Sequence, residues 1–471
     1  MSDTFPRQHA RTQRLTLGEP RNFTVSPDGA RIVFARSATG SDPVNMLWVL
    51  DVESGTERTV LDPRNIPADL AALTDEEKRR RERAREGAGG VVSYSCDADA
   101  TKAVTVLGGQ LFVVDLLTDA VSTPAVAPGV FDARLSPDGT RIAYVRGASL
   151  CVCDPAGNER VIAHDDSANV SWGSADFIAA EEMGRQRGYW WSPDGTHIAA
   201  CRVDESPVDV WHIADPAHPE RGAVEHRYPA AGTRNALVEL AVINVATTAR
   251  VPVSLPVHHE YLNSVNWTDG GLIAQTQTRD QRAVTVSRID PSTGDCTTVF
   301  EDIDDAWVEL VPGVPFVDSH GHLVTCADRD GARRVLVDGA PVTPGHMQVR
   351  SVISGGSRIV FVANEMDTPW VHNIFSVNPD GSGLQNVHPT DGIVSGTSLG
   401  STTVVRTSSL DSSRASFSVL LDNREIGIRS LAEEPLVSPN VRITTVGPRR
   451  IPVAILTPRD GRDTKLPVLF D

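Results

Sequence analysis

Two adjacent glutamates, Glu181 and Glu182, are the residues of this sequence whose spacing points most directly to binding chemistry. They lie in a run of helix-forming residues, and neighbouring side chains on a helix point about 100° apart, so the two carboxylates repel each other. Such a pair is tolerated in solvent, or it is held together by a cation that binds both carboxylates. The rest of the sequence has to decide between these two interpretations.

The glutamate pair is expected on a short helix at residues 175–184, directly before a β-strand. Ser174 is suited to cap the start of this helix, and Gly184 is suited to end it. Trp190 and Trp191 belong to the following strand, which ends in the tight-turn sequence SPDG at residues 192–195. A strand and its turn are therefore expected to position the helix.

The same turn recurs along the chain and predicts the fold. SPDG occurs at residues 26–29, 136–139 and 192–195. Weaker copies are found at 96–99, 267–270, 318–321, 354–357 and 398–401. Each is followed by a strand with alternating polar and apolar residues, which is typical of an all-β fold. Four-stranded units repeating at roughly 35–75 residues are blades of a propeller, so we predict an eight-bladed β-propeller over residues 20–432, after an N-terminal segment at 1–19.

A helical arm is predicted at residues 66–90, between the first two turns. Thr74 and Glu77 have the spacing of a capping box, and Gly87 is suited to end the helix. The later part is rich in arginine, which complements the helix dipole; the arginines are Arg79, Arg80, Arg81, Arg83 and Arg85. Because the arm has almost no apolar stripe, it is either a solvated charged helix or an element that carries arginines to a ligand.

Residues 433–471 differ from the repeats. VRITTV, RIPVAILTP and LPVLFD predict strands of another domain, and the last of these is typical of a buried parallel strand. A sheet of that kind needs covering helices, which do not follow in this sequence. We therefore expect this region to be the beginning of a domain that is cut short.

Composition excludes several partners. A net charge of −17 over 471 residues argues against nucleic acid and favours cationic ligands. There is no apolar run long enough to span a membrane and no apolar core of a signal peptide, which predicts a cytoplasmic protein. The six cysteines and the pair His258-His259 lack metal-ligand spacing, so we expect neither a metal site nor a cofactor.

Five phrases of the sequence, in this order, resemble a known family. They are RRRERAREGAGGVVSY (79–94), FIAAEEM…RGYWWSPDG (177–195), CRVDESPVDVWHI (201–213), HRYPAAGTRNALVEL (226–240), and EYLNSVNW (260–267) with RDQ (279–281). Together they resemble the N-terminal propeller of the dipeptidyl peptidase IV group of the prolyl oligopeptidase family of serine peptidases. The arginine-rich segment and RGYWW are closest to bacterial and dipeptidyl peptidase 8/9-like members. The resemblance extends from about residue 10 to residue 471.

The resemblance implies a role for the site residues. In the family a glutamate pair binds the free N-terminal ammonium of the peptide substrate, and Glu181 and Glu182 match that pair. An arginine of the arm binds a substrate carbonyl in 8/9-like members; Arg81, Arg83 and Arg85 match that segment, and we favour Arg85. The implied function is a substrate-gating propeller of an exopeptidase that releases N-terminal dipeptides of the Xaa-Pro or Xaa-Ala type. Many members of the family are dimers, so a homodimer is possible.

Catalytic residues are not expected within this chain. The sequence Gly396-Thr397-Ser398-Leu399-Gly400 matches G-x-S-x-G, but a β-strand follows it instead of the helix of a nucleophile elbow. In the family the nucleophile, acid and histidine follow the position of LPVLFD, so residues 433–471 match the truncated start of an α/β-hydrolase domain. The chain is predicted to be inactive without that domain. The alternative is a non-catalytic propeller binding module, and a reading frame that continues into a GWSYG-type elbow would argue against it.

Overall fold

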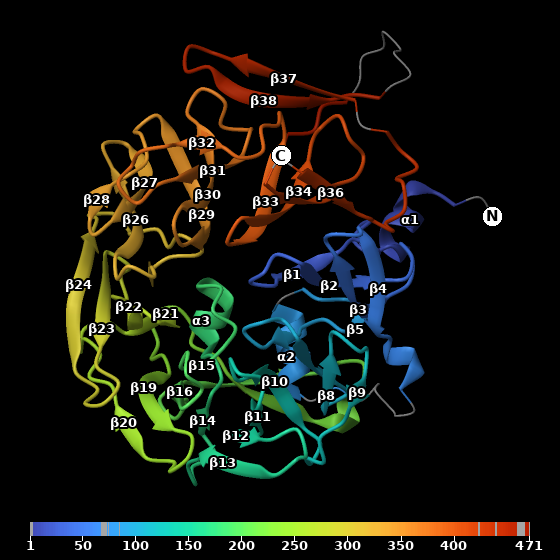
Figure 1. The fold of residues 1–471 in the computed structure, drawn as a ribbon. Helices are drawn as coiled ribbons and strands as arrows, with labels where there is room; N and C mark the ends of the chain where they lie inside the picture. Colours follow the sequence, from blue (N-terminus) through green and yellow to red (C-terminus); the bar gives the residue numbers. More distant parts are fainter. Residues whose placement is uncertain are drawn as a thin grey trace.

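The protein is described here by a computed structural model that covers residues 3–66, 73, 75–83, 85–422, 424–438, 440–458 and 467–470. Eight antiparallel sheets stand around a ring, which confirms the predicted eight-bladed β-propeller (Figure 1). All eight predicted turns join the first to the second hairpin-forming strand of a blade. The repeat in the sequence is therefore the repeat of the fold.

Blades 1 to 4 form the first half of the ring. Blade 1 comprises β1 (Arg21–Val25), β2 (Arg31–Ser37), β3 (Val44–Asp51) and β4 (Thr56–Leu61), with β5 (Gly89–Gly90) parallel to β3. Blade 2 comprises β6 (Ser95–Cys96), β7 (Lys102–Leu107), β8 (Gln110–Asp115) and β9 (Val121–Ser122). Blade 3 comprises β10 (Val130–Leu135), β11 (Ile142–Arg146), β12 (Ser149–Cys153) and β13 (Glu159–Ala163). Blade 4 comprises β14 (Val170–Trp172), β15 (Tyr189–Trp191), β16 (His197–Asp204), β19 (Leu237–Asn244) and β20 (Arg250–Pro252).

Blades 5 to 8 complete the ring. Blade 5 comprises β21 (Tyr261–Thr268), β22 (Gly271–Gln277), β23 (Ala283–Ile289) and β24 (Cys296–Ile303). Blade 6 comprises β25 (Phe316–Val317), β26 (Leu323–Arg329), β27 (Ala332–Val337) and β28 (Ala340–Pro341). Blade 7 comprises β29 (Met347–Gly355), β30 (Ile359–Glu365), β31 (Asn373–Val377) and β32 (Gln385–Asn386). Blade 8 comprises β33 (Ile393–Leu399), β34 (Thr402–Ser408), β35 (Ser416–Leu421) and β36 (Arg424–Ile428).

Side-chain hydrogen bonds explain why the SPDG sequence forms the turn. In blade 4, Ser192 Oγ donates to Asp194 Oδ1 at 2.5 Å, and the same carboxylate accepts from the backbone N of Thr196 at 3.0 Å. Gly195 has φ +66°, a left-handed conformation that glycine adopts without steric cost. Because all of these contacts are local, the short sequence alone determines the turn.

The hydrophobic core lies between neighbouring blades, so most blades are buried on both faces. Trp191 and Ile198 of blade 4, for example, pack with Val145 and Leu150 of blade 3. The first strands of several neighbouring blades contact one another, among them β6 with β10, β15 with β21, and β29 with β33. These strands are therefore the inner strands of the ring, and anything inserted into them reaches the centre.

The ring closes at a seam between blade 1 and blade 8. Apolar residues of both blades share one core there, and a buried ion pair lies beside it. Arg36 Nη2 is 2.7 Å from Glu57 Oε2, with side chains 0% and 3% exposed. Glu57 also accepts from the backbone N of Arg429, just after β36, at 2.8 Å. This pair therefore joins the first blade to the last.

The N-terminal segment and the chain after blade 8 reinforce the same seam. Helix α1 (Phe5–Arg11) contributes Gln8, whose Nε2 donates to Glu434 O at 2.7 Å and whose Oε1 accepts from Leu436 N at 2.8 Å. Arg11 forms an ion pair with Glu433. A short 3-10 helix, η1 (Pro63–Asn65), follows blade 1. Among the described residues, no helix combines the length and apolar character needed to cross a membrane.

In the described residues after the propeller, β37 (Val441–Val446) and β38 (Ile451–Leu456) form a hairpin (Figure 1). These two strands match the predicted VRITTV and RIPVAILTP. The predicted buried parallel strand at LPVLFD is not observed in its described residues, 467–470, which belong to no strand. Val468, Leu469 and Phe470 are 72%, 96% and 96% exposed. The pattern was apolar enough for a central strand, but such a strand needs a neighbour on each side, and this segment pairs with none.

Candidate functional site

The glutamate helix is an insertion into the inner strand of blade 4. β14 and β15 both pair with β16, and residues 173–188 leave the sheet between them. The backbone of Cys201 in β16 binds both ends of this insertion: Gly173 N donates to Cys201 O at 2.9 Å, and Cys201 N donates to Gly188 O at 2.7 Å. A Cβ on Gly188 would lie 2.3 Å from Ser174 O, so the close approach of the two ends requires glycine.

Helix α3 (Phe177–Glu182) is fixed by a buried ion pair. Asp176, and not Ser174 as predicted, is its N-cap: Asp176 Oδ2 accepts from Ala179 N at 3.1 Å. Asp176 Oδ1 binds Arg185 Nη2 at 2.8 Å, with side chains 9% and 4% exposed. Ser and Asp are similarly good caps, so the choice is made by the tertiary contact with Arg185.

Arg185 also connects α3 to the next blade. Its Nε donates to Leu262 O of β21 at 3.0 Å, and its Nη1 donates to Arg187 O at 2.9 Å. The helix is shorter than the predicted 175–184, and Gly184 follows its C-cap with φ +67°. One arginine thus holds the N-cap, the connecting loop and the inner strand of blade 5 in a single arrangement.

Glu181 and Glu182 are the last two residues of α3, and both are exposed. Figure 1 shows α3 in the middle of the ring, beside β15 and β21. The C-terminal end of a helix carries partial negative charge, so two carboxylates at this end add to the negative potential instead of cancelling it. This arrangement favours a bound cation more than the same pair would at the start of a helix.

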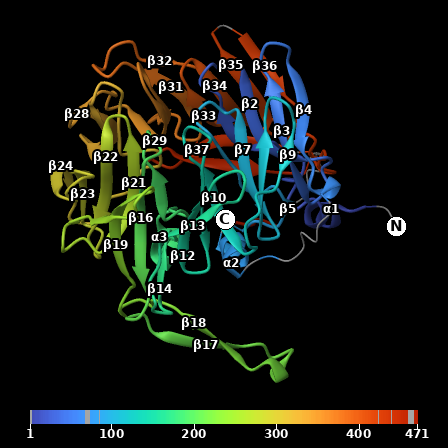
Figure 2. The same ribbon diagram turned by 60° about the horizontal axis from the view of Figure 1, so that its bottom comes forward.

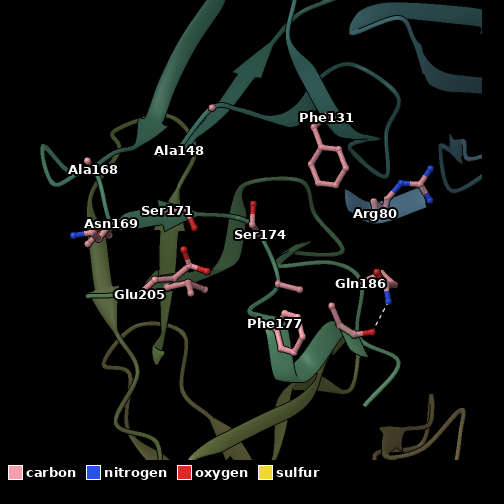
Figure 3. A pocket seen from close by; sticks show the side chains of 15 residues that line it. Arg80, Phe131, Ala148, Ala168, Asn169, Ser171, Ser174, Phe177, Gln186 and Glu205 are labelled. Carbon is pink, nitrogen blue, oxygen red and sulfur yellow. Dashed lines mark hydrogen bonds between the residues drawn. The ribbon is translucent and has the colours of Figure 1, made fainter. Parts of the chain in front are cut away.

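A cavity of about 290 Å³ opens beside α3 (Figure 3). Gln186 Nε2 donates to Ala180 O at 2.6 Å at its edge, and Arg80 and Phe131 lie opposite Phe177. Its wall combines apolar side chains with polar groups: Arg80, Phe131, Gly147, Ala148, Ala168, Asn169, Val170, Ser171, Ser174, Ala175, Phe177, Ala180, Gln186, Val203 and Glu205. A cavity with a few polar groups in an apolar wall is the usual form of a site for a small ligand or a peptide end.

The arginine-rich arm contributes Arg80 to this cavity. Helix α2 (Asp75–Arg83) carries Glu77, which binds Arg80 Nη2 at 2.7 Å and Arg81 Nε at 2.6 Å. Although burial lowers the pKa of Arg80, Glu77 and the more distant Asp132 raise it above its ordinary value, so the group is charged. Sequence reasoning did not single out Arg80, because helix periodicity does not say which face of an all-polar helix meets the propeller.

The predicted C-terminal end of the arm helix is wrong. The helix ends at Arg83 and not at Gly87, because Arg85 already has φ +50° and the next residue, Glu86, binds Arg21 of blade 1 at 2.8 Å. Thr74 of the predicted capping box lies outside the described residues. Local sequence could not reveal the anchor on blade 1, which determines where the chain leaves the helix.

Arg85, the arm arginine favoured from sequence, lies at a different hollow. It is exposed, and it lines a space of about 320 Å³ together with residues of the N-terminal segment, blade 1 and the arm, namely Gln13, Arg14, Thr16, Arg21, Glu86 and Gly87. The cavity beside α3 does not include it. Of the arm arginines whose side chains the structure describes, which exclude Arg79 and Arg83, it brings Arg80, and not Arg85, to the wall of that cavity.

A protruding hairpin next to the site was not predicted. β17 (Val210–Ala214) and β18 (Ala223–Arg227), with η2 (Pro219–Arg221) between them, extend away from blade 4 (Figure 2). At its base, Tyr228 makes edge-to-face contacts with Trp211 and with Phe177 of α3, at ring-centroid distances of 5.4 and 5.3 Å. The alternation in VDVWHI and the Pro- and Gly-containing connection were the available sequence signals.

Two further sequence motifs have structural surroundings that explain them. Ser398 of the G-x-S-x-G sequence is buried near the end of β33, and its Oγ is 3.2 Å from Thr402 O and 2.9 Å from Thr403 Oγ1. It lies in the blade 8 turn, as predicted, and no nucleophile elbow is formed there. Next to the His258-His259 pair, Glu260 binds Arg279 at 3.1 Å and Asn235 at 2.8 Å.

Comparisons with known proteins agree with this architecture. The family model for the dipeptidyl peptidase IV (DPP IV) N-terminal region matches residues 105–404. A putative dipeptidyl aminopeptidase of Schizosaccharomyces pombe is 27% identical over 194 residues, which are 38% of this chain and 24% of that protein. A probable dipeptidyl peptidase 4 of Aspergillus fumigatus is 25% identical over 247 residues, which are 47% of this chain and 32% of that protein. The chain thus spans about a quarter to a third of the length of these relatives.

A solved structure shares the fold. The crystal structure of Porphyromonas gingivalis dipeptidyl peptidase 4 superposes with a TM-score of 0.72 at 18% identity, covering 93% of this chain and 64% of that one. An eight-bladed propeller with a helix inserted into one inner strand defines the class of this molecule. The chain belongs to the family of the dipeptidyl peptidase IV N-terminal region.

Proposed function

We propose that this chain is the substrate-gating propeller of a serine exopeptidase that releases N-terminal dipeptides of the Xaa-Pro or Xaa-Ala type. The observation that carries the proposal is the exposed Glu181–Glu182 pair at the C-terminal end of α3, in the middle of the ring. A peptide ammonium between the two carboxylates relieves their repulsion and forms charge-assisted hydrogen bonds with both. Holding the amine at a fixed point also determines which peptide bond reaches the nucleophile.

The arm completes the peptide site in this proposal. An arginine that donates to a substrate carbonyl has to lie near the glutamate pair. Arg80 lines the cavity next to α3, whose wall includes Phe177 and Ala180 of that helix but neither Glu181 nor Glu182, and Arg80 is already oriented by Glu77. Arg85 faces the N-terminal segment. We therefore assign the carbonyl contact to Arg80 in place of Arg85.

The chemistry is proposed to come from a hydrolase domain that begins in residues 433–471. Two observations support this: the β37–β38 hairpin stands outside the eight blades, and an apolar hollow of about 500 Å³ lies between it and the edge of the ring. Val441, Ile443 and Val453 of the hairpin line this hollow, together with Trp370 and Leu410 of the propeller side. Under this proposal, the hollow is filled when the domain packs on the ring.

A homodimer is the proposed assembly, with the β17–β18 hairpin as the contact. Large apolar side chains are exposed on it, including Trp211 at 51%, Ile213 at 57% and Val224 at 58%. An isolated two-stranded ribbon is marginally stable in water, and clustered exposed apolar residues are typical of protein contacts. Light scattering of the wild type and of Ile213→Glu tests this, and a monomeric wild type would contradict it.

Steady-state kinetics of an intact enzyme carrying this propeller test the proposed function. Glu181→Ala or Glu182→Ala should lower kcat/KM for free-amine dipeptide substrates. The decrease should correspond to a loss of about 2–5 kcal/mol of transition-state stabilisation, the cost of breaking a desolvated charge pair. N-acetylated substrates should be cleaved poorly for the same reason. Wild-type efficiency in both variants would contradict the proposal.

The alternative, a non-catalytic peptide-binding module, would be favoured if the chain binds free-amine peptides but no enzyme carrying it cleaves them.

A further inference from the structure

A second charged cluster lies where β10 of blade 3 meets the insertion that carries α3, directly after Phe131 of the cavity wall. Arg134 Nη2 binds Asp132 Oδ1 at 2.8 Å, and Arg80 and Arg187 lie close enough to Asp132 to interact with it electrostatically. The strand register shifts between Phe131 and Arg134, and Asp132 has φ +47°. Bulges of this kind redirect side chains and are frequent next to binding sites.

Positive charge exceeds negative charge in this cluster. Three guanidinium groups, of Arg80, Arg134 and Arg187, share Asp132, and Glu77 on α2 is already bound by Arg80 and Arg81. Counting Glu77 with Arg81, and Glu86, which also acts on Arg80, with its partner Arg21, the described residues of the group hold five arginines and three carboxylates. An excess of two positive charges stands out in a chain of net charge −17. Such an excess in a partly enclosed place is stabilised by an anion.

Arg187 differs from Arg80 and Arg134 because no described carboxylate forms an ion pair with it. Its Nε and Nη2 donate to Tyr189 O at 3.0 and 2.8 Å, and its guanidinium lies 5.3 Å from the ring centroid of Trp190. Among the described residues it forms no ion pair. Burial, and then repulsion by Arg134, lower the pKa of Arg187 to about 9. An anion beside it would reverse this shift.

The cluster also contains polar atoms that the protein leaves unsatisfied. Within the described part of the chain, the buried Arg134 Nε and Asp132 Oδ2 have no hydrogen-bond partner. Buried polar atoms without partners are uncommon, and each costs free energy. A donor at Arg134 Nε next to the unpaired Arg187 is the arrangement that a planar carboxylate fills, since guanidinium groups bind it with two parallel hydrogen bonds.

We propose that Arg134 and Arg187, with Arg80 beside them, form a carboxylate-binding subsite that takes an acidic side chain of the peptide held at α3. The proposal rests on the proposed function, because the peptide amine is taken to lie at Glu181 and Glu182. The two ends of the site then have opposite charge: the carboxylates on α3 bind the amine, and the guanidinium groups of blade 3, the arm and the end of the insertion bind the acid. The preferred ligand is a peptide with a free amine and an Asp or Glu near its N-terminus.

Binding of matched peptides to the whole chain tests this. The probes are free-amine pentapeptides with one Glu placed in turn at each position, each compared with the same peptide containing Gln. Isothermal titration calorimetry gives the affinities, and tryptophan fluorescence reports on Trp190 beneath Arg187. We expect one Glu peptide to bind about tenfold or more tightly than its Gln counterpart, as a charge-assisted pair implies. Arg187→Gln and Arg134→Gln should each abolish that preference.

Arg250→Gln is the matched control. Arg250 also lies over a tryptophan, 4.7 Å from the ring centroid of Trp172 in the same blade, but it lines a different cavity. It should keep the full Glu preference. Equal affinity for Glu and Gln peptides at every position, or a preference that survives in both cluster variants, would overturn the proposal.

Two further measurements distinguish failure of the proposed function from failure of the proposed subsite. If inorganic phosphate binds to the wild type and not to Arg187→Gln, while no Glu peptide is preferred, the subsite takes a free anion and the peptide assignment is wrong. If N-acetylation leaves affinity unchanged while the Glu preference persists, the amine clamp fails and the carboxylate subsite stands. These outcomes keep the proposed function and the subsite independently testable.

Discussion

Blades 4 and 8 follow the same plan, but only one of them interrupts its inner strand. In blade 8, β33 pairs continuously with β34, and Ser398 is buried and hydrogen-bonded within the turn. In blade 4, residues 173–188 leave the inner strand between β14 and β15 and carry Glu181 and Glu182, both exposed. The motif in blade 8 that resembles a catalytic sequence is part of the repeat and stabilises its turn, whereas the insertion in blade 4 exposes two carboxylates near the centre of the ring.

Breaking the anchor of the insertion should have the largest effect. Asp176→Ala removes the N-cap of α3 and leaves Arg185 as a buried charge without its carboxylate. Removing one partner of a buried ion pair costs about 3–5 kcal/mol, so urea unfolding at pH 7 should show a loss of that size. Peptide binding should also be lost, because α3 no longer has a fixed position.

Two controls sharpen this prediction. Glu57→Ala breaks the equally buried pair with Arg36 at the seam, and it should lower stability similarly while the folded protein still binds peptide. Glu239→Ala removes an ion-pair partner of Arg202. Because the side chain of Glu239 is 64% exposed, this change should cost less than about 1 kcal/mol. If Asp176→Ala were as mild as Glu239→Ala, the insertion would not depend on this anchor.

Ser398→Ala tests the motif in blade 8, and it should lower stability less than Asp176→Ala does. The change removes a buried hydroxyl that contacts Thr402 O and Thr403 Oγ1. One lost hydrogen bond costs about 0.5–1.5 kcal/mol, so the free energy of unfolding should fall by that amount. Peptide affinity should stay at the wild-type value, and a large loss of affinity or of enzyme activity would show that the motif has a functional role.

The smallest predicted effect concerns the turn of blade 4 and its pH dependence. Hydrogen bonds from Ser192 and Thr196 lower the pKa of Asp194 to about 2. Since this value is below that of the unfolded chain, about 3.9, the charged turn stabilises the fold above pH ~4, and this contribution is lost as the pH falls toward about 2. The stability difference between wild type and Asp194→Asn should therefore shrink between pH 6 and pH 3 in urea unfolding. A difference that does not change with pH would exclude this cause.

The fold could be predicted because its signals are local. Each turn depends on contacts within a few residues, as Ser192 and Asp194 show. The eight turn motifs of the sequence therefore correctly predicted eight blades. The segment at 467–470 shows the limit of that reasoning, because a buried strand depends on neighbours that no local pattern describes.

The site could be predicted only in part, because its geometry depends on contacts between distant segments. The short helix and its two glutamates follow from local sequence, but its cap depends on Arg185, which also binds Leu262 of the next blade. The position of Arg80 depends on how an all-polar helix lies against the propeller. The role of the glutamates themselves stays a prediction.

The most direct test of the central claim is the affinity of this chain for one peptide with and without N-acetylation. Calorimetry would compare an Ala-Pro-containing pentapeptide and its acetylated form, for the wild type and for Glu181→Gln with Glu182→Gln. The account predicts that acetylation weakens wild-type binding by about tenfold or more, the equivalent of one charge-assisted hydrogen bond, and has no effect in the double variant. Equal affinity of the wild type for both peptides would contradict the claim that the pair on α3 binds a peptide amine.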